Sequence, residues 1–261
     1  MKYSIVTIGL LLLLSTVSIS AQTPEEKGLA IAKEADLRDA GFGDYTADML
    51  MVLRNRHGQE SKRKIRLEVL EVSDDGDKSL IVFDNPRDVK GTAFLNFTHK
   101  ADDDDQWLYL PALNRVKRIS SSNKSGSFMG SEFAYEDFSS QEIEKYTYKW
   151  IRGEIIDDLD CYVVEFVPVD NKSGYSRQLV WIDKAEYRTL KVEFYDRKSS
   201  LLKILVINGY QQYLGRYWRA ERLNMVNHQN GKSTELIWSD YQFQNGLNES
   251  NFSQASLKRA R

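Results

Sequence analysis

Residues 107–138 read WLYLPALNRVKRISSSNKSGSFMGSEFAYEDF, and this stretch differs from the rest of the chain. It begins with a large apolar run from Trp107 to Leu110, which Pro111 ends. A basic segment and a polar run from Ser120 to Ser127 follow, and the stretch then becomes aromatic again. A strand, a flexible polar loop and a second apolar limb suit a wall and a lid around something apolar. They do not resemble a catalytic centre.

The first 21 residues have the layout of a secretory signal peptide. Lys2 supplies a positive start, residues 5–17 form an apolar run, and small residues precede an expected cleavage after Ala21. The apolar run is shorter than the ~20 residues that span a bilayer, so an uncleaved anchor is the less favoured alternative. No Cys stands at the cleavage site. We therefore expect an exported domain at residues 22–261 that is not itself a lipoprotein.

Composition limits the class of protein further. The net charge of −2 gives no electrostatic basis for binding nucleic acid. The single cysteine, Cys161, cannot form an internal disulfide, so the exported chain must rely on its hydrophobic core. The length suits one large all-β domain.

One helix and a long series of strands account for most of the chain. Thr23, Pro24 and Glu26 form the capping signal of a helix that runs to Ala40. Alternating apolar and polar residues then predict strands at 49–54, 64–69, 79–83, 91–97, 107–110, 145–152, 161–167, 178–182, 189–195, 201–207, 217–226 and 233–241. We expect about ten or eleven antiparallel strands in one curved sheet, a barrel or a sandwich. Residues 248–257 are either a short helix or a strand cap.

The sequence shows no catalytic or metal-binding constellation. The histidines, His57, His99 and His228, have no metal-ligand or relay spacing. The acidic runs 74–77 and 102–105 lack the spaced ligands of a calcium loop and are better explained as hairpin turns. We therefore predict no metal, no cofactor and no enzyme. Carboxylate pairs of glycosidases are invisible in a sequence, so an envelope enzyme that acts on glycan stays open as a minor alternative.

Apolar side chains exceed what one ordinary sheet face needs. The candidate cavity and lid residues are Trp107, Leu108, Tyr109, Leu110, Phe128, Met129, Phe133 and Tyr135. Because side chains alternate along a strand, Trp107 or Leu108, and Tyr109 or Leu110, would face inward. Phe128 and Met129 follow an exposed polar loop, so a lid over a ligand explains them better than core packing.

The central motif resembles the LolA-like outer-membrane lipoprotein-sorting proteins. The similarity rests on WLYLPALNRVKRI at 107–119 followed by SGSFMGSEFAYEDF at 125–138. Residues 41–44 after the first helix, the strand 180–183 and the late strand at Thr234 are also similar, so the resemblance spans most of the chain.

This resemblance implies a mainly β fold: a half-open antiparallel barrel with an N-terminal helix and a helical or loop lid over an apolar cavity. It implies a periplasmic carrier that shields acyl chains of lipidated protein or lipid on the way to the outer membrane. An inner-membrane transporter and an outer-membrane acceptor are the expected partners. Classical carriers use an arginine to lock the lid, but nothing assigns that role to Arg115 or Arg118. The long polar loop is typical of a divergent branch that serves lipid export beside a membrane pump.

The leading hypothesis is therefore a carrier of lipidated protein or free lipid without covalent chemistry. An envelope scaffold whose sheet is filled by its own side chains is the alternative from a different class. An apolar cavity would argue against the scaffold, and a filled interior would support it.

Overall fold

The computed structural model describes residues 22–259, so the predicted signal peptide lies outside the described residues. The helices are α1 (Pro24–Asp39) and α2 (Gln254–Arg259), with short 3-10 turns η1 (Pro111–Leu113), η2 (Ser121–Asn123), η3 (Tyr135–Phe138), η4 (Ile143–Lys145) and η5 (Glu249–Asn251). The strands are β1 (Asp44–Arg54), β2 (Glu60–Leu70), β3 (Lys78–Asn85), β4 (Ala93–Phe97), β5 (Asp105–Leu110), β6 (Arg115–Ile119), β7 (Tyr146–Ile156), β8 (Leu159–Pro168), β9 (Tyr175–Asp183), β10 (Thr189–Asp196), β11 (Leu201–Asn208), β12 (Gln211–Tyr213), β13 (Tyr217–Arg219), β14 (Arg222–Asn227) and β15 (Ser233–Phe243).

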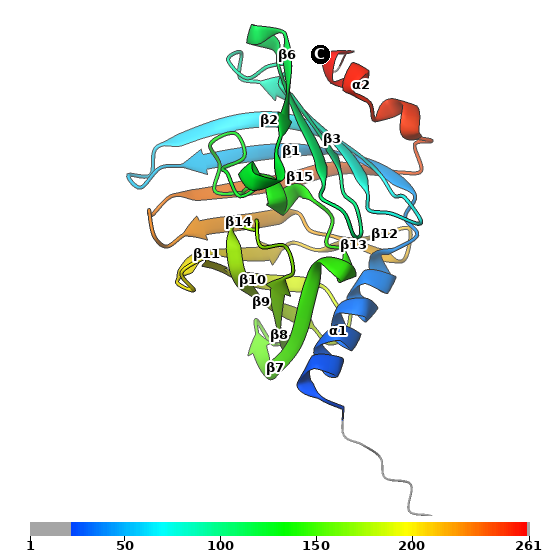
Figure 1. The fold of residues 1–261 in the computed structure, drawn as a ribbon, viewed down its shortest axis with the longest axis vertical. Helices are drawn as coiled ribbons and strands as arrows, with labels where there is room; N and C mark the ends of the chain where they lie inside the picture. The colour runs from blue at the N-terminus through cyan, green and yellow to red at the C-terminus, as the bar shows by residue number, and fades with distance from the viewer. Residues whose placement is uncertain (1–21, 260–261) are drawn as a thin grey trace, which may run out of the picture.

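Helix α1 begins where its capping signal predicts. The Thr23 hydroxyl accepts a hydrogen bond from the Glu26 amide at 3.1 Å, and the Glu26 carboxylate accepts one from the Thr23 amide at 2.8 Å. The helix lies close to strand β7 (Figure 1). At Gly28 an added Cβ would stand 2.7 Å from the backbone nitrogens of Lys149 and Trp150. Only glycine therefore allows this approach, which covers part of the edge of β7.

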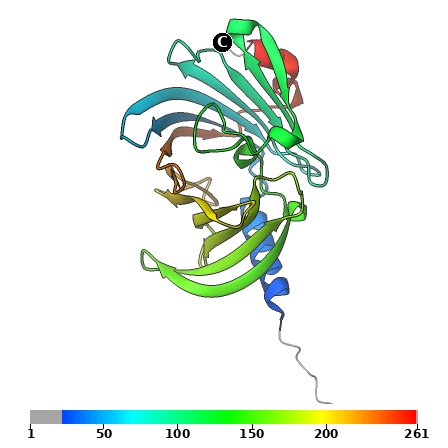
Figure 2. The same ribbon diagram turned by 60° about the vertical axis from the view of Figure 1, so that its left-hand side comes forward.

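Thirteen strands form one antiparallel sheet in the order β6-β5-β4-β3-β2-β1-β15-β14-β11-β10-β9-β8-β7, and β12 pairs with β13 separately. The sheet is strongly curved (Figures 1 and 2). It is not closed, because its outer strands, β6 and β7, do not pair with each other. This agrees with the half-open barrel that the resemblance implies. The expected ten or eleven strands were too few, because the structure has fifteen. Strands β6 and β12 are short, and the predicted strand 217–226 is two strands, β13 and β14.

The two faces of the sheet pack against different elements. In β2, Ile65, Leu67 and Val69 join the main core on the concave face, while the residues between them point outward. On the convex face of β3, β4 and β5, a second cluster packs against Phe252 and Leu257 from the C-terminal segment. The end of the chain is thus the short helix α2, one of the two predicted possibilities.

Within residues 22–259, no helix is long and apolar enough to cross a membrane. In the same part of the chain, no group of three or more His, Cys, Asp or Glu side chains is arranged to hold a metal ion.

Candidate ligand cavity beneath the lid segment

Residues 120–142, here called the lid segment, leave β6 and cross the concave side of the sheet before the chain enters β7 (Figures 1 and 2). The segment folds back on itself, because the Phe128 amide donates to the Phe133 carbonyl at 2.7 Å. Met129 (φ 50°) and Gly130 (φ 80°) form the left-handed turn between them. This tight turn directs the aromatic side chains on both sides of it into the protein.

A buried ion pair fixes the lid segment to the C-terminal half of the sheet. The Lys203 ammonium on β11 lies 2.7 Å from an Asp137 carboxylate oxygen in η3, and only 3% of Lys203 is exposed. The ammonium also donates to the Glu132 carbonyl at 2.9 Å, and the Tyr175 hydroxyl donates to Asp137 at 2.7 Å. Taking each charge out of water costs several kcal/mol, and the ion pair and its hydrogen bonds offset this cost.

Other contacts fix the lid segment to the N-terminal half of the sheet. The Arg63 guanidinium on β2 donates from Nη1 to the Met129 carbonyl at 2.5 Å. Arg63 is half-buried, and this partial burial lowers the pKa of its guanidinium. On β5, Gln106 donates from Nε2 to the Tyr135 carbonyl at 3.1 Å. The lid segment therefore bridges both halves of the curved sheet.

A cavity of about 310 Å³, here called the lid cavity, lies between the lid segment and the C-terminal half of the sheet. Its floor consists of apolar side chains from the concave faces of β10, β11 and β14. They are Val192, Phe194, Leu205, Ile207, Leu223 and Met225. Phe133 of the lid segment and Tyr146 and Tyr175 of the sheet contribute to its wall.

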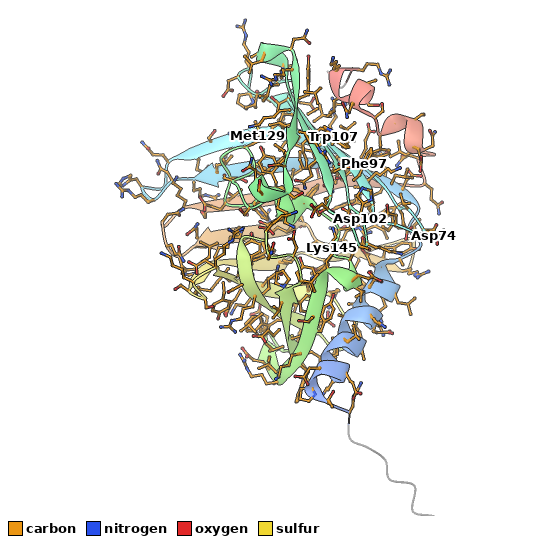
Figure 3. The ribbon with its side chains drawn as sticks, viewed as in Figure 1. Asp74, Phe97, Asp102, Trp107, Met129 and Lys145 are labelled. Carbon is orange, nitrogen blue, oxygen red and sulfur yellow. The ribbon has the colours of Figure 1, made fainter. Side chains whose placement is uncertain are left out.

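Ion pairs of Asp103 and Asp104, which line the lid cavity, join the elements around it. Asp103 in the β4–β5 turn pairs with Lys172 in the β8–β9 turn at 2.8 Å, and Asp104 pairs with Lys145. Figure 3 shows Asp102, beside these aspartates in the same turn, near Lys145 at the front of the molecule. The pair of Asp103 and Lys172 is exposed on both sides and contributes little stability, whereas the Asp104 side chain is only 9% exposed.

A second cavity of about 740 Å³, here called the helix cavity, lies beneath the C-terminal half of α1. It adjoins the lid cavity, since Lys100, Ser140, Gln141 and Thr189 line both. Its lining is mostly polar and contains several carboxylates. Burial and the neighbouring carboxylate of Glu142 raise the pKa of Asp77 in this lining to about 7.

The structure separates the predicted residues of β5 by face. Leu108 and Leu110 join the core on the concave face, whereas Trp107 and Tyr109 belong to the cluster on the convex face. Trp107 packs edge-on against Phe97, with ring centroids 5.2 Å apart (Figure 3). Each pair thus supplies one inward residue, as strand alternation requires.

The predicted residues of the lid segment come together but face the core. Phe128 is 0% exposed, and its ring lies 5.2 Å from Phe94 and 5.4 Å from Tyr135. Met129 is half-buried at the turn. Of the eight predicted residues, all within the described part of the chain, Phe133 alone lines either of these two cavities. In this structure Phe128 therefore closes the core.

Sequence reasoning missed the residues that hold the lid segment in place. Lys203 carried a usable signal, because it occupies an inward position of a strand in which Leu205 and Ile207 also face inward. A lysine at such a position must find a buried partner. Nothing in the sequence identified Arg63 or Asp137.

The comparisons with known proteins agree with this geometry. A solved domain from Vibrio parahaemolyticus, named as an outer membrane lipoprotein-sorting protein domain, is 59% identical; the match covers 90% of this chain and 100% of that chain, with a TM-score of 0.89. The chain belongs to this lipoprotein-sorting family. A DUF1329 family protein from Desulfovibrio piger is a further relative, at 31% identity and a TM-score of 0.86, with 90% of this chain and 99% of that chain covered.

The wider fold of the lipoprotein-sorting family is LolA-like. A LolA superfamily protein from Nitrosomonas europaea shares the fold at 23% identity and a TM-score of 0.70, with 88% of this chain and 98% of that chain covered. A family model described as an uncharacterized protein matches residues 75–259. Among curated protein sequences, none matches this chain. The resemblance of residues 107–138 to LolA-like proteins is thereby confirmed.

Proposed function

We infer that the protein is a periplasmic carrier that holds the acyl chains of a lipidated protein or lipid in the lid cavity. The observation that carries this inference is the apolar floor on β10, β11 and β14 beneath a segment anchored to both halves of the sheet. The relative named for outer membrane lipoprotein sorting and the predicted signal peptide support transfer between the two membranes. An inner-membrane transporter would load the carrier, and an outer-membrane acceptor would unload it.

The energetics explain why such a carrier needs a closed apolar site. Each methylene removed from water is worth about 0.8 kcal/mol, so free acyl chains do not cross an aqueous space unaided. The volume of about 310 Å³ is at the lower end for ligand cavities. A longer chain requires the lid segment to lift, which would expose Phe128, Met129, Tyr135, Leu108 and Leu110 to the ligand. Trp107 and Tyr109, on the convex face, are left out of the proposed site.

Release of the acyl cargo requires the closed, empty carrier to be close in free energy to the loaded carrier. The bond from Arg63 to the Met129 carbonyl and the pair of Lys203 with Asp137 stabilise the closed lid segment. Arg63 is thus our candidate for the lid-locking arginine, and Arg115 and Arg118, exposed on the edge strand, are not. Cargo that lifts the lid must outweigh these contacts, which favours its transfer to an acceptor with a more apolar site.

Two neighbouring residues of β11 give a matched test. Ile207 lines the floor of the lid cavity, while the adjacent Val206 points to the opposite face and is 40% exposed. We expect Ile207→Trp to fill the cavity and weaken binding of a fluorescent fatty acid at least about tenfold, the value of about two methylenes. Val206→Trp should bind as the wild type does. The proposal fails if the wild type does not bind the probe, or if the two variants bind it equally well.

One observation favours a glycan-cleaving enzyme as the second candidate. Asp77 and Glu142 line the same helix cavity, and a carboxyl with a pKa of about 7 is suited to act as a general acid. Release of reducing ends from purified envelope glycan, abolished by Asp77→Asn, would support an enzyme. Equal, background-level release by the wild type and the variant would exclude this role for Asp77.

A further inference from the structure

We propose that the corner of the molecule around the β5–β6 hairpin is a docking surface for an anionic membrane. It consists of the β5–β6 hairpin, the β3–β4 turn (residues 86–91) and α2, and we call it the basic corner. Strand β6 ends the sheet, so one of its edges is unpaired. Arg115, Lys117 and Arg118 on this strand are exposed, and the hairpin presents Leu113 with 68% of its surface exposed.

The three parts of the basic corner lie side by side. The β3–β4 turn approaches the hairpin, because an added Cβ at Gly91 would lie 3.7 Å from Pro111. Helix α2 packs Leu257 into the cluster that contains Tyr109 of β5. Figures 1 and 2 both show the end of α2 beside η1, the 3-10 turn at the hairpin tip. Charges on these parts therefore act on one partner together.

The charges in the basic corner are strongly one-sided. Its exposed cations are Arg87, Lys90, Arg115, Lys117, Arg118, Lys258 and Arg259. Its carboxylates are Asp88 and Asp105, and Asp105 is already paired with Arg118. The whole chain has a net charge of −2, so the rest of the molecule is acidic. An anionic surface therefore attracts the basic corner and repels the net negative charge of the rest of the molecule.

The shape of the hairpin tip suits a lipid surface. Pro111, Ala112 and Leu113 form a tip without polar side chains, and cations flank it. The Tyr109 hydroxyl donates to the Asn114 side chain at 3.1 Å, and Asn114 adopts a left-handed conformation (φ 46°), so the tip is held in a defined shape. An apolar tip ringed by cations matches the interface of a bilayer, where lipid phosphates lie above acyl chains.

Protection of the sheet edge explains only part of this pattern. Charged side chains on β6 would discourage another strand from pairing with it. Arg87 and Lys90 in the β3–β4 turn and Lys258 and Arg259 in α2 lie outside that edge strand, and edge protection gives no reason for them. A membrane surface accounts for these four cations as well as for Arg115, Lys117 and Leu113.

Vesicle flotation with the purified, cargo-free full chain tests the proposal. We expect binding to vesicles that contain phosphatidylglycerol, no binding to pure phosphatidylcholine vesicles, and loss of binding at high salt. Arg115→Glu with Lys117→Glu should weaken binding at least about tenfold. Lys198→Glu with Lys232→Glu changes the net charge equally at two other exposed turns and should bind nearly as the wild type does.

The outcomes separate this proposal from the carrier function. Fluorescent fatty acid binding by the Arg115→Glu/Lys117→Glu variant should match the wild type, which also shows that the variant is folded. If the wild type does not bind phosphatidylglycerol vesicles, or if the two double variants bind equally, the membrane proposal is overturned while the lid cavity is unaffected. The basic corner would then either prevent another strand from pairing with β6 or bind an acidic protein.

Discussion

At the scale of single residues, the pair of Lys203 and Asp137 is a buried contact that holds the lid segment against the sheet. Lys203→Met would leave the Asp137 carboxylate buried without its counter-charge. We expect a loss of about 3–5 kcal/mol in the free energy of unfolding, measured by urea denaturation. Lys203→Met combined with Asp137→Asn removes both charges and should recover part of this loss. A double variant as unstable as the sum of the two single variants would contradict the account.

Asp77 predicts a specific dependence of stability on pH. Burial and nearby carboxylates raise its pKa from 3.8 to about 7, so folding favours the protonated form. Its contribution to stability is full at a pH below about 4 and is lost as the pH rises through 7. Asp77→Asn mimics the protonated form and should be more stable than the wild type at pH 8, by at most about 4 kcal/mol. The gain should shrink towards pH 5. If the variant and the wild type differed in unfolding free energy by the same amount at pH 8 and at pH 5, the raised pKa of Asp77 would be contradicted.

At the scale of elements, the close approach of α1 to β7 is open to a direct test. Alanine favours helix over glycine by about 1 kcal/mol, so Gly28→Ala would stabilise an isolated helix. Here the new Cβ would meet the β7 backbone at 2.7 Å, and we expect a net loss of about 1–3 kcal/mol in thermal or urea unfolding. Lys33→Ala, on an exposed position of the same helix, should have little effect. A more stable Gly28→Ala would show that α1 can move away from β7 at little cost.

Local sequence patterns predicted the positions of individual elements better than the total number of strands. The capping box at Thr23 and Glu26 placed the start of α1, and alternation placed β2. The count of strands was too low because β12 has only three residues and because β6, RVKRI, reads as a basic segment. Strands β13 and β14 are separate because β13 pairs with β12, whereas β14 pairs with β15. The local sequence does not show with which strand a segment pairs.

At the scale of the whole molecule, the sheet order decides which residues meet. The floor of the lid cavity comes from β10, β11 and β14, far along the chain from the motif at 107–138. No spacing in the sequence relates these strands to the lid segment, so the sequence directed attention to residues 107–138 and not to the strands that form the floor of the cavity. The family resemblance supplied the half-open architecture, which composition had left open between a barrel and a sandwich.

The most direct test of the carrier account is lipid mass spectrometry on the protein purified from its native envelope. The account predicts a bound molecule with acyl chains, about one per protein chain, retained by Val206→Trp and lost in Ile207→Trp. A wild-type protein without any acyl-containing molecule would contradict the account, and so would equal retention by the two variants.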